Sequence, residues 1–292
     1  LANGKNVVEV EEVVAATKDL SFEDYVELRR LHLIISMIYN GKGYAGLFKF
    51  FRQSDLDVFL LLKGMLHNFS QAPITVRESV VDFEKETRDE LWDSEEDLRS
   101  FYSDDQNYDL LVSGDLGANL LQKYVAAFLM EASDDWLRYS FTVAEDIVRE
   151  HLNDDQSLRK LKNIERYSGA RTRNIFAENR LNVIPAISLE YDVEAWVLDE
   201  DSKPLDEFQF QKSRRVRFLF TREQYALMED YIQRFGNTHQ GIGKILTKMN
   251  INSVWRKCVY SDDLKWAEEE EASDIYYSLI DEQASGGVIA RR

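Results

Sequence analysis

The sequence predicts a mainly α-helical protein with a small antiparallel β-sheet inserted before the last helices. Two observations support this prediction. Only three prolines occur in 292 residues, so few positions interrupt long helices. After residue 182 the apolar residues change from helical spacing to strict alternation, which is typical of a half-buried strand.

The helices are predicted from apolar periodicity and from capping residues at their starts. Ser21 with Asp24 three residues later is a capping-box variant, and it predicts a helix over residues 21–39. Ser54 with Asp57, and Thr75 with Glu78, repeat the signal ahead of apolar runs. The helical pattern continues to Trp92 and returns over 110–137, 143–152 and 158–167. Ahead of the first helix, the valine-rich residues 6–17 predict a strand.

The second half of the chain contains the predicted sheet. Residues 187–197 alternate between apolar and polar positions, and a second alternation runs from Phe208 to Phe220. Thr221 with Gln224 then predicts a helix to about Phe235, followed by a glycine-bearing loop over 236–244. The expected organisation is a strand or linker from a preceding domain (1–20), a helical domain (21–182), the small sheet (183–221), a helix, glycine loop and C-terminal helix (222–260), and an acidic helix and tail (261–292).

Composition excludes several classes of protein. With 36 Lys and Arg against 53 Asp and Glu the net charge is −17, so no nucleic-acid partner is expected. The single Cys258 excludes an internal disulfide and a cysteine zinc site or iron–sulfur cluster held by this chain alone. The longest stretch without charged side chains is about eleven residues, shorter than a membrane span. A cytoplasmic location is expected, and the first residue, Leu1, favours a processed or excised chain.

No catalytic constellation stands out. The four histidines lack zinc-site spacing, and the paired carboxylates are interpreted as helix starts. The glycine loop departs from the Walker pattern, because Ile242 and Gly243 separate Lys244 from the preceding glycine. Residues 213–260 nevertheless hold nine bases and three acids in a strongly acidic chain. The basic side chains near the loop therefore form a possible contact for an anion or a partner: Arg214, Arg215, Arg217, His239 and Lys244.

Two stretches resemble a known family. Residues 11–30, EEVVAATKDLSFEDYVELRR, resemble the passage just after the barrel in cobalamin-binding radical S-adenosylmethionine (SAM) proteins. Residues 231–260, which contain FGNTHQGIGKIL and Arg256, resemble the carboxy-terminal end of the same proteins. The family's Cys-x-x-x-Cys-x-x-Cys cluster motif and its cobalamin domain are absent from this sequence. No functional residue can therefore be carried over from the family.

The resemblance implies a noncatalytic carboxy-terminal accessory domain of a radical SAM enzyme, which covers the barrel or shapes substrate access. Its partner would be the preceding barrel of the same polypeptide. The parent family's [4Fe–4S] cluster, SAM and cobalamin would bind outside this chain, which is expected to hold no cofactor. The alternative is a stand-alone helical protein-interaction module, and a weaker third is a hydrolase or metal enzyme with carboxylate ligands from distant helices.

One helical segment also bears on oligomeric state. Seven of the nine residues from Leu31 to Tyr39 are apolar, so this helix must be buried on more than one side. If a missing barrel supplies part of that burial, the excised chain exposes an apolar patch and forms a homo-oligomer.

Overall fold

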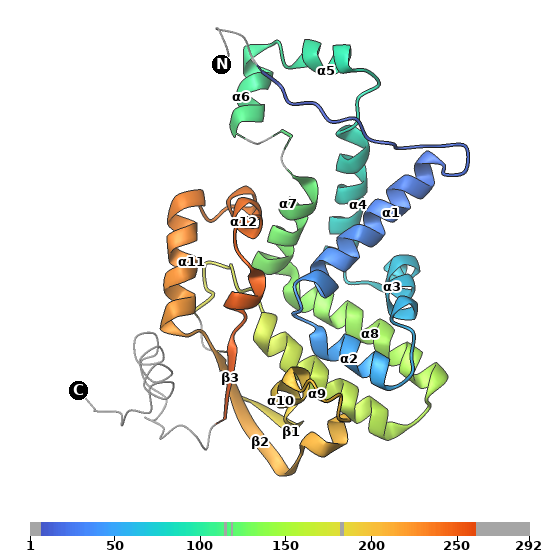
Figure 1. The fold of residues 1–292 in the computed structure, drawn as a ribbon, viewed down its shortest axis with the longest axis vertical. Helices are drawn as coiled ribbons and strands as arrows, with labels where there is room; N and C mark the ends of the chain where they lie inside the picture. Colours follow the sequence, from blue (N-terminus) through green and yellow to red (C-terminus); the bar gives the residue numbers. More distant parts are fainter. Residues whose placement is uncertain (1–6, 114–115, 118, 182–183, 261–292) are drawn as a thin grey trace, which may run out of the picture.

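The computed structural model describes residues 7–113, 116–117, 119–181 and 184–260. The described chain is mainly helical with a three-stranded antiparallel sheet, as the sequence predicts (Figure 1). The α-helices are α1 (Phe22–Ile35), α2 (Ala45–Gln53), α3 (Val58–His67), α4 (Ile74–Asp89), α5 (Glu95–Phe101), α6 (Asp105–Ser113), α7 (Leu120–Ala127), α8 (Ser133–His151), α9 (Asp155–Thr172), α10 (Val193–Leu198), α11 (Arg222–Phe235) and α12 (His239–Leu246). The strands are β1 (Ile187–Tyr191), β2 (Gln209–Leu219) and β3 (Lys257–Tyr260).

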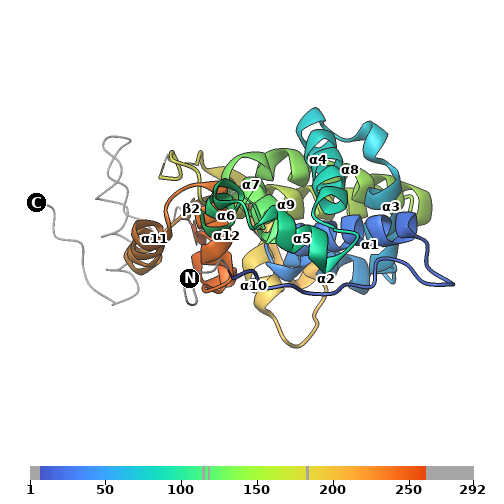
Figure 2. The ribbon, with the colours of Figure 1, turned by 90° about the horizontal axis from the view of Figure 1, so that it is seen from above.

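The helices α1 to α4 pack with α7, α8 and α9 around one hydrophobic core (Figures 1 and 2). Helix α1 begins as predicted, because the Ser21 hydroxyl accepts the Asp24 N–H and the Asp24 carboxylate accepts the Ser21 N–H. A turn of π-helix, Ser36–Asn40, extends it. Helices α8 and α9 lie side by side and join through a short loop at Asp154, whose side chain caps α9.

The apolar segment from Leu31 to Tyr39 lies inside this core. Leu33, Ile34 and Ile38 are completely buried, and Tyr39 at the end of the segment is its only exposed apolar residue. The burial comes from this chain's own helices, since α1 contacts α3, α4 and α7. The exposed patch expected if a barrel were missing is therefore not present over Leu31–Tyr39, although Leu28 earlier in α1 is exposed.

Several expected boundaries among the helices are wrong. The helix expected over 110–137 is interrupted, because α6 ends at Ser113 and the side chain of Asn119 caps α7 by accepting the Gln122 N–H. Helix α4 starts behind Pro73, so Thr75 is not its cap. The Thr75 hydroxyl instead lies 2.5 Å from a carboxylate oxygen of Asp135.

The strand expected over residues 6–17 does not form in the described residues from Val7 onward. At Val7 both backbone groups bond to the Tyr108 hydroxyl, and no neighbouring strand pairs with the following valines. The valine-rich composition favours extended backbone, but a strand also needs a partner to accept its hydrogen bonds. The segment instead crosses the end of the molecule that carries α5 and α6 (Figure 1).

The sheet has the order β1-β2-β3, with β2 in the middle. Ile187 of β1 pairs with Val216 of β2, and Val216 also faces Tyr260 of β3. The sequence predicted that the sheet would be complete before the last helices. In the structure its third strand, β3, follows α11 and α12 in the chain, so this part of the prediction is wrong. The C-terminal helix expected before residue 260 is accordingly replaced by a 3₁₀ turn, Ile251–Val254, and β3.

The strand predicted from the alternation over 187–197 forms only as far as Tyr191. There the Asp192 side chain accepts the Ala195 N–H and starts α10. Val193 and Trp196, three residues apart, are both buried, as expected for one face of a helical turn, whereas an alternating strand would place them on opposite faces. A second short helix, the 3₁₀ turn Leu205–Phe208, leads into β2.

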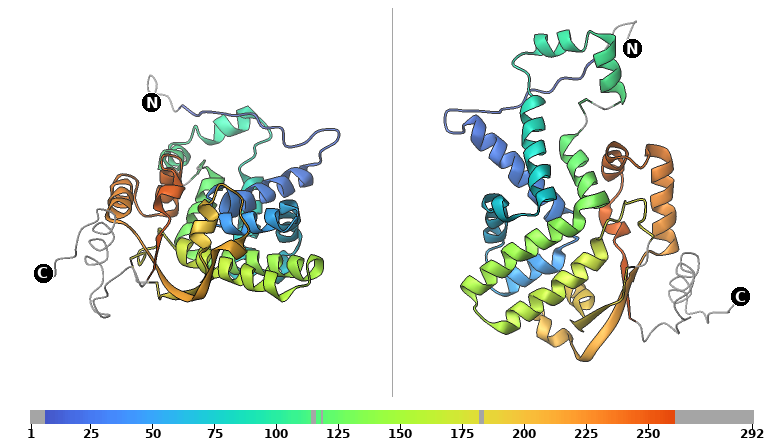
Figure 3. Two further views of the ribbon diagram at one scale, coloured as in Figure 1. Left: turned by 60° about the horizontal axis from the view of Figure 1, so that its bottom comes forward. Right: turned by 180° about the vertical axis from the view of Figure 1, so that it is seen from behind.

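The glycine-bearing loop is in fact largely helical. Thr221 and Gln224 form the predicted capping box of α11, which ends at Gly236 with a φ of +83°. Thr238 then caps α12, and this helix contains Gly241 and Gly243. Helix α12 lies beside α7 (Figure 3), with Gly243 facing the backbone of α7 at Gln122. The acidic helix expected at Glu268–Glu271 falls outside the described residues.

Candidate partner-binding groove

The basic residues singled out in the sequence separate into two groups. Arg214, Arg215 and Arg217 lie on β2, where Arg215 and Arg217 share one face and Arg214 lies on the other. The Arg214 guanidinium stacks over the Phe210 and Tyr260 rings, with its carbon 5.5 and 4.3 Å from their centroids. This arginine is therefore committed to aromatic neighbours within the chain.

The remaining two residues, His239 and Lys244, lie on α12. Their helix packs on α7, whereas β2 packs on β1, β3 and α9, so the structure does not gather the five residues into one patch. The His239 Nε2 atom lies 2.7 Å from Glu131 Oε1, and this hydrogen bond connects α12 to the segment that follows α7. Sequence proximity suggested a shared surface, but the chain between β2 and α12 turns away from the sheet through α11 (Figure 1).

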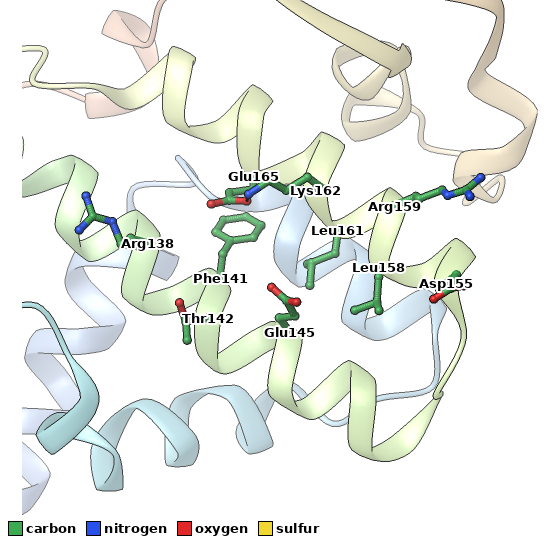
Figure 4. Close-up of a pocket in the computed structure, with 10 residues that line it drawn as sticks. All are labelled: Arg138, Phe141, Thr142, Glu145, Asp155, Leu158, Arg159, Leu161, Lys162 and Glu165. Carbon is green, nitrogen blue, oxygen red and sulfur yellow. Dashed lines mark hydrogen bonds and ion pairs between the residues drawn. The ribbon is translucent and has the colours of Figure 1, made fainter.

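A hollow of about 480 Å³ lies between α8 and α9 (Figure 4). Its apolar lining comes from both helices and consists of Phe141, Leu158 and Leu161. Phe141 and Leu161 are buried, so the hollow reaches down to the core. Charged residues surround this apolar floor: Arg138, Glu145, Asp155, Arg159, Lys162 and Glu165.

A second hollow of about 370 Å³ continues along α9 toward the sheet. It shares Lys162 and Glu165 with the first, and its apolar walls include Leu137, Ile184 and Ile187. Gly169 lies under Leu137, whose side chain would stand 2.5 Å from a Cβ at that position. The two hollows together form what we call the α9 groove, bounded by α8 on one side and by residues 184–187 at its far end.

Four exposed cations line this groove: Arg159, Lys162 and Arg166 on α9, and Arg173 directly after the last residue of the helix. The spacing of three and four residues keeps the three on α9 on the same side of the helix. We call the four cations the α9 basic stripe. Its length, from 14 residues of helical rise, is about 21 Å.

Two members of the stripe have no acidic partner in the described part of the chain. Lys162 pairs with Glu165 at 2.5 Å, and Arg173 with Asp134 at 2.9 Å. Arg159 forms no ion pair with a described residue, and Arg166 only approaches the Ser188 carbonyl oxygen at 3.5 Å. The stripe therefore presents two guanidinium groups without an acidic partner in the described residues at the edge of the groove, and that of Arg159 points away from Phe141 (Figure 4). The sequence signal for this stripe is the helical spacing of bases within residues 159–173, and the stripe was not among the sites expected from the sequence.

A second cluster surrounds the cysteine. Glu194 of α10 accepts the Cys258 backbone N–H at 3.2 Å, and Arg171 of α9 lies close enough to influence both side chains. Burial raises the pKa of Glu194, and the nearby Arg171 only partly opposes that effect. Burial, together with the Glu194 carboxylate, raises the pKa of the Cys258 thiol.

The cluster favours a neutral thiol at physiological pH. A thiol must ionise before it can attack an electrophile or bind a metal tightly, so this environment opposes both roles. No group of three potential metal ligands occurs among the residues that the structure describes. The cluster instead connects α9, α10 and β3.

Within the described ranges, none of the helices has the length and apolar composition needed to cross a bilayer. Comparison of the chain with protein-family models, with curated proteins and with solved structures gave no match.

Proposed function

We propose that this chain is a noncatalytic protein-interaction domain whose α9 groove binds an acidic, partly apolar segment of a partner protein. The observation that carries the proposal is the pair of exposed guanidinium groups, Arg159 and Arg166, which have no acidic partner among the described residues. They stand beside hollows with apolar linings. In a chain with a net charge of −17, such a local surface stands out.

The groove matches the chemistry of an acidic amphipathic segment. Carboxylates can bond to Arg159 and Arg166 through two N–H groups each, which adds geometric selectivity to the charge attraction. Apolar side chains of the same segment can enter the hollows, over Phe141 and against Ile187. Exposed ion pairs contribute only about 0.2–1 kcal/mol each, so apolar burial must provide much of the affinity.

The resemblance described above supports a narrower form of this proposal, in which the partner is the barrel of a radical SAM enzyme. The accessory domain would then act in the cytoplasm without a cofactor of its own. Residues 11–30 and 231–260 are the support for it. The coding sequence upstream of Leu1 tests this form: a Cys-x-x-x-Cys-x-x-Cys motif within a few hundred codons is expected, and its absence from the full coding sequence would contradict it.

The groove itself can be tested with a synthetic peptide. The probe is a fluorescent helical peptide of about 16 residues, or about four turns, with leucines on one face and glutamates beside them. We expect saturable binding that weakens as salt is added, because charge attraction is screened. Reversing both guanidinium charges, Arg159→Glu with Arg166→Glu, should weaken binding about tenfold, because it removes two ion pairs and adds repulsion between like charges.

The matched control reverses two exposed arginines outside the groove, Arg52 and Arg77. This variant has the same net charge as the groove variant, so a general charge effect would weaken both equally. The proposal is supported if the control variant still binds the peptide and the groove variant does not. Equal affinity of the groove variant and the wild type would contradict it.

A further inference from the structure

We infer that the groove has an occupant within the same chain: the acidic carboxy-terminal segment, residues 261–292. The segment would bind the α9 groove and compete there with external partners. The inference rests on the proposed function, because it assigns the natural ligand of the same groove. It adds that the domain is self-inhibited until a partner displaces the segment.

Charge complementarity is the first argument. Residues 261–292 contain nine acids and three bases, whereas the α9 basic stripe contains four cations. The acidic run Glu268–Glu271 offers neighbouring carboxylates to Arg159 and Arg166, which have no acidic partner within the described ranges.

The apolar pattern of the segment is the second argument. Ile275, Tyr276, Leu279 and Ile280 recur at the spacing of one helical face, directly after the acidic run. A ligand for the groove needs apolar side chains beside carboxylates, because the hollows have apolar walls inside a charged rim. This segment combines both features within about a dozen residues.

The third argument is where the described chain ends. Tyr260 faces Val216 of β2, and Val216 pairs with Ile187 of β1, which lines the second hollow. Neighbouring strands are about 4.8 Å apart, so the backbone at Tyr260 lies about 10 Å from Ile187. Three or four extended residues cover that distance, and the 32 residues after Tyr260 are ample to reach along the groove.

A tethered ligand has a strong advantage over a free one. A short flexible connection gives an effective concentration in the millimolar range. If the free segment binds with a dissociation constant of about 100 μM, the tether reduces the apparent affinity for a competing peptide about tenfold.

The first test compares full-length variants with the synthetic acidic peptide as probe. Replacing Glu268, Glu269, Glu270 and Glu271 together by Gln should strengthen peptide binding about tenfold relative to the wild type. The matched control replaces four exposed glutamates elsewhere, Glu9, Glu11, Glu12 and Glu200, by Gln. This control has the same net charge and should bind the peptide as the wild type does.

The second test detects the contact itself. A carbodiimide joins a carboxylate to an amine only where the two touch, and Lys162 is the amine of the stripe. We expect cross-links from Lys162 to Glu268–Glu271 within the monomer, and their loss when the Arg159→Glu and Arg166→Glu substitutions are introduced.

The outcomes distinguish this inference from the proposed function. The inference is wrong if the wild type and the variant with the neutralised segment bind the peptide equally well. If reversal of Arg159 and Arg166 still abolishes binding in that case, the proposed function of the groove is retained. Cross-links found only between two chains also overturn occupation within one chain. Failure of the peptide to bind any variant, including the neutralised one, would instead refute the proposed function.

Discussion

At the scale of single residues, burial and neighbours decide what a carboxylate does in this protein. Asp24 is at the surface, where hydrogen bonds from Ser21 lower its pKa and keep it charged at the start of α1. Glu194 lies between α9, α10 and β3, where burial raises its pKa. The sequence shows both as acids near an apolar run, and only the packing separates their roles.

Glu194 leads to a prediction about pH. Its pKa is higher in the folded chain than the ordinary value of 4.5, so the folded state binds more protons than the unfolded state around and above that pH. The contribution of Glu194 to the free energy of unfolding therefore falls as pH rises from about 4.5 through its folded pKa. Gln keeps an oxygen that can accept the Cys258 N–H but does not titrate.

The measurement is chemical denaturation of wild type and Glu194→Gln between pH 4 and pH 8. We expect the stability of wild type relative to the variant to decrease with rising pH. An exposed Glu78→Gln variant serves as the control for loss of one carboxylate. A stability difference that stays constant over this range would show that Glu194 is not destabilised by burial.

At the scale of elements, a cap and a partner three residues apart predict helix starts only in part, because Asp57 and not Ser54 caps α3, and α4 starts behind Pro73 and not at Thr75. The boxes at Ser21 and Thr221 were visible in the sequence and form as expected. The cap at Asp192 was not visible, because the residues after it also fit the alternation of a strand. The strand β3 could not be predicted at all, since its four residues gain their partner from β2, about 40 residues earlier.

The candidate site was predictable in part for the same reason. The spacing of Arg159, Lys162 and Arg166 can be read from the sequence, because it depends only on α9 being a helix. The hollows depend on how α8 and residues 184–187 pack against α9, which local pattern does not show. Conversely, Arg214 looked available in the sequence but stacks on Tyr260, 46 residues later.

Helix α12 provides a prediction about close packing. A Cβ on Gly241 would lie 2.4 Å from the carbonyl oxygens of Phe235 and Gly236, whereas one on Gly243 would meet Gln122 at 3.4 Å. Backbone atoms cannot move aside easily, so Gly241→Ala should lower the free energy of unfolding by about 2 kcal/mol. Gly243→Ala gains helix propensity, and its effect should stay within about 1 kcal/mol.

Urea denaturation of the two variants measures this difference. The comparison controls for helix propensity, because both glycines lie in the same helix. If the two alanines cost the same, the tight approach of α12 to the end of α11 is not what requires glycine at residue 241.

At the scale of the whole molecule, the core is built from this chain's own elements. Ile38 is 0% exposed and belongs to the same hydrophobic cluster as residues from α2, α8 and β2. Ile38→Asp places a charge in that cluster, which costs more than about 4 kcal/mol and should unfold the chain. The result to expect is loss of the cooperative thermal transition seen by circular dichroism.

The control for this substitution is Leu198→Asp, at a side chain that is 70% exposed. It should leave the thermal transition unchanged within a few degrees. If Ile38→Asp instead remains folded and only changes an oligomer to a monomer in light scattering, the helix is an interface, and the account of the core given above is wrong.

The central claim is that the α9 basic stripe attracts an acidic segment to the groove, and exchanging the charges on both sides tests it most directly. The glutamates of the synthetic peptide are replaced by lysines, and this peptide is titrated against wild type and against the Arg159→Glu, Arg166→Glu variant. We predict that the lysine peptide binds the variant at least about tenfold more tightly than it binds wild type, the reverse of the order for the glutamate peptide. The same order of affinities for both peptides would contradict the claim.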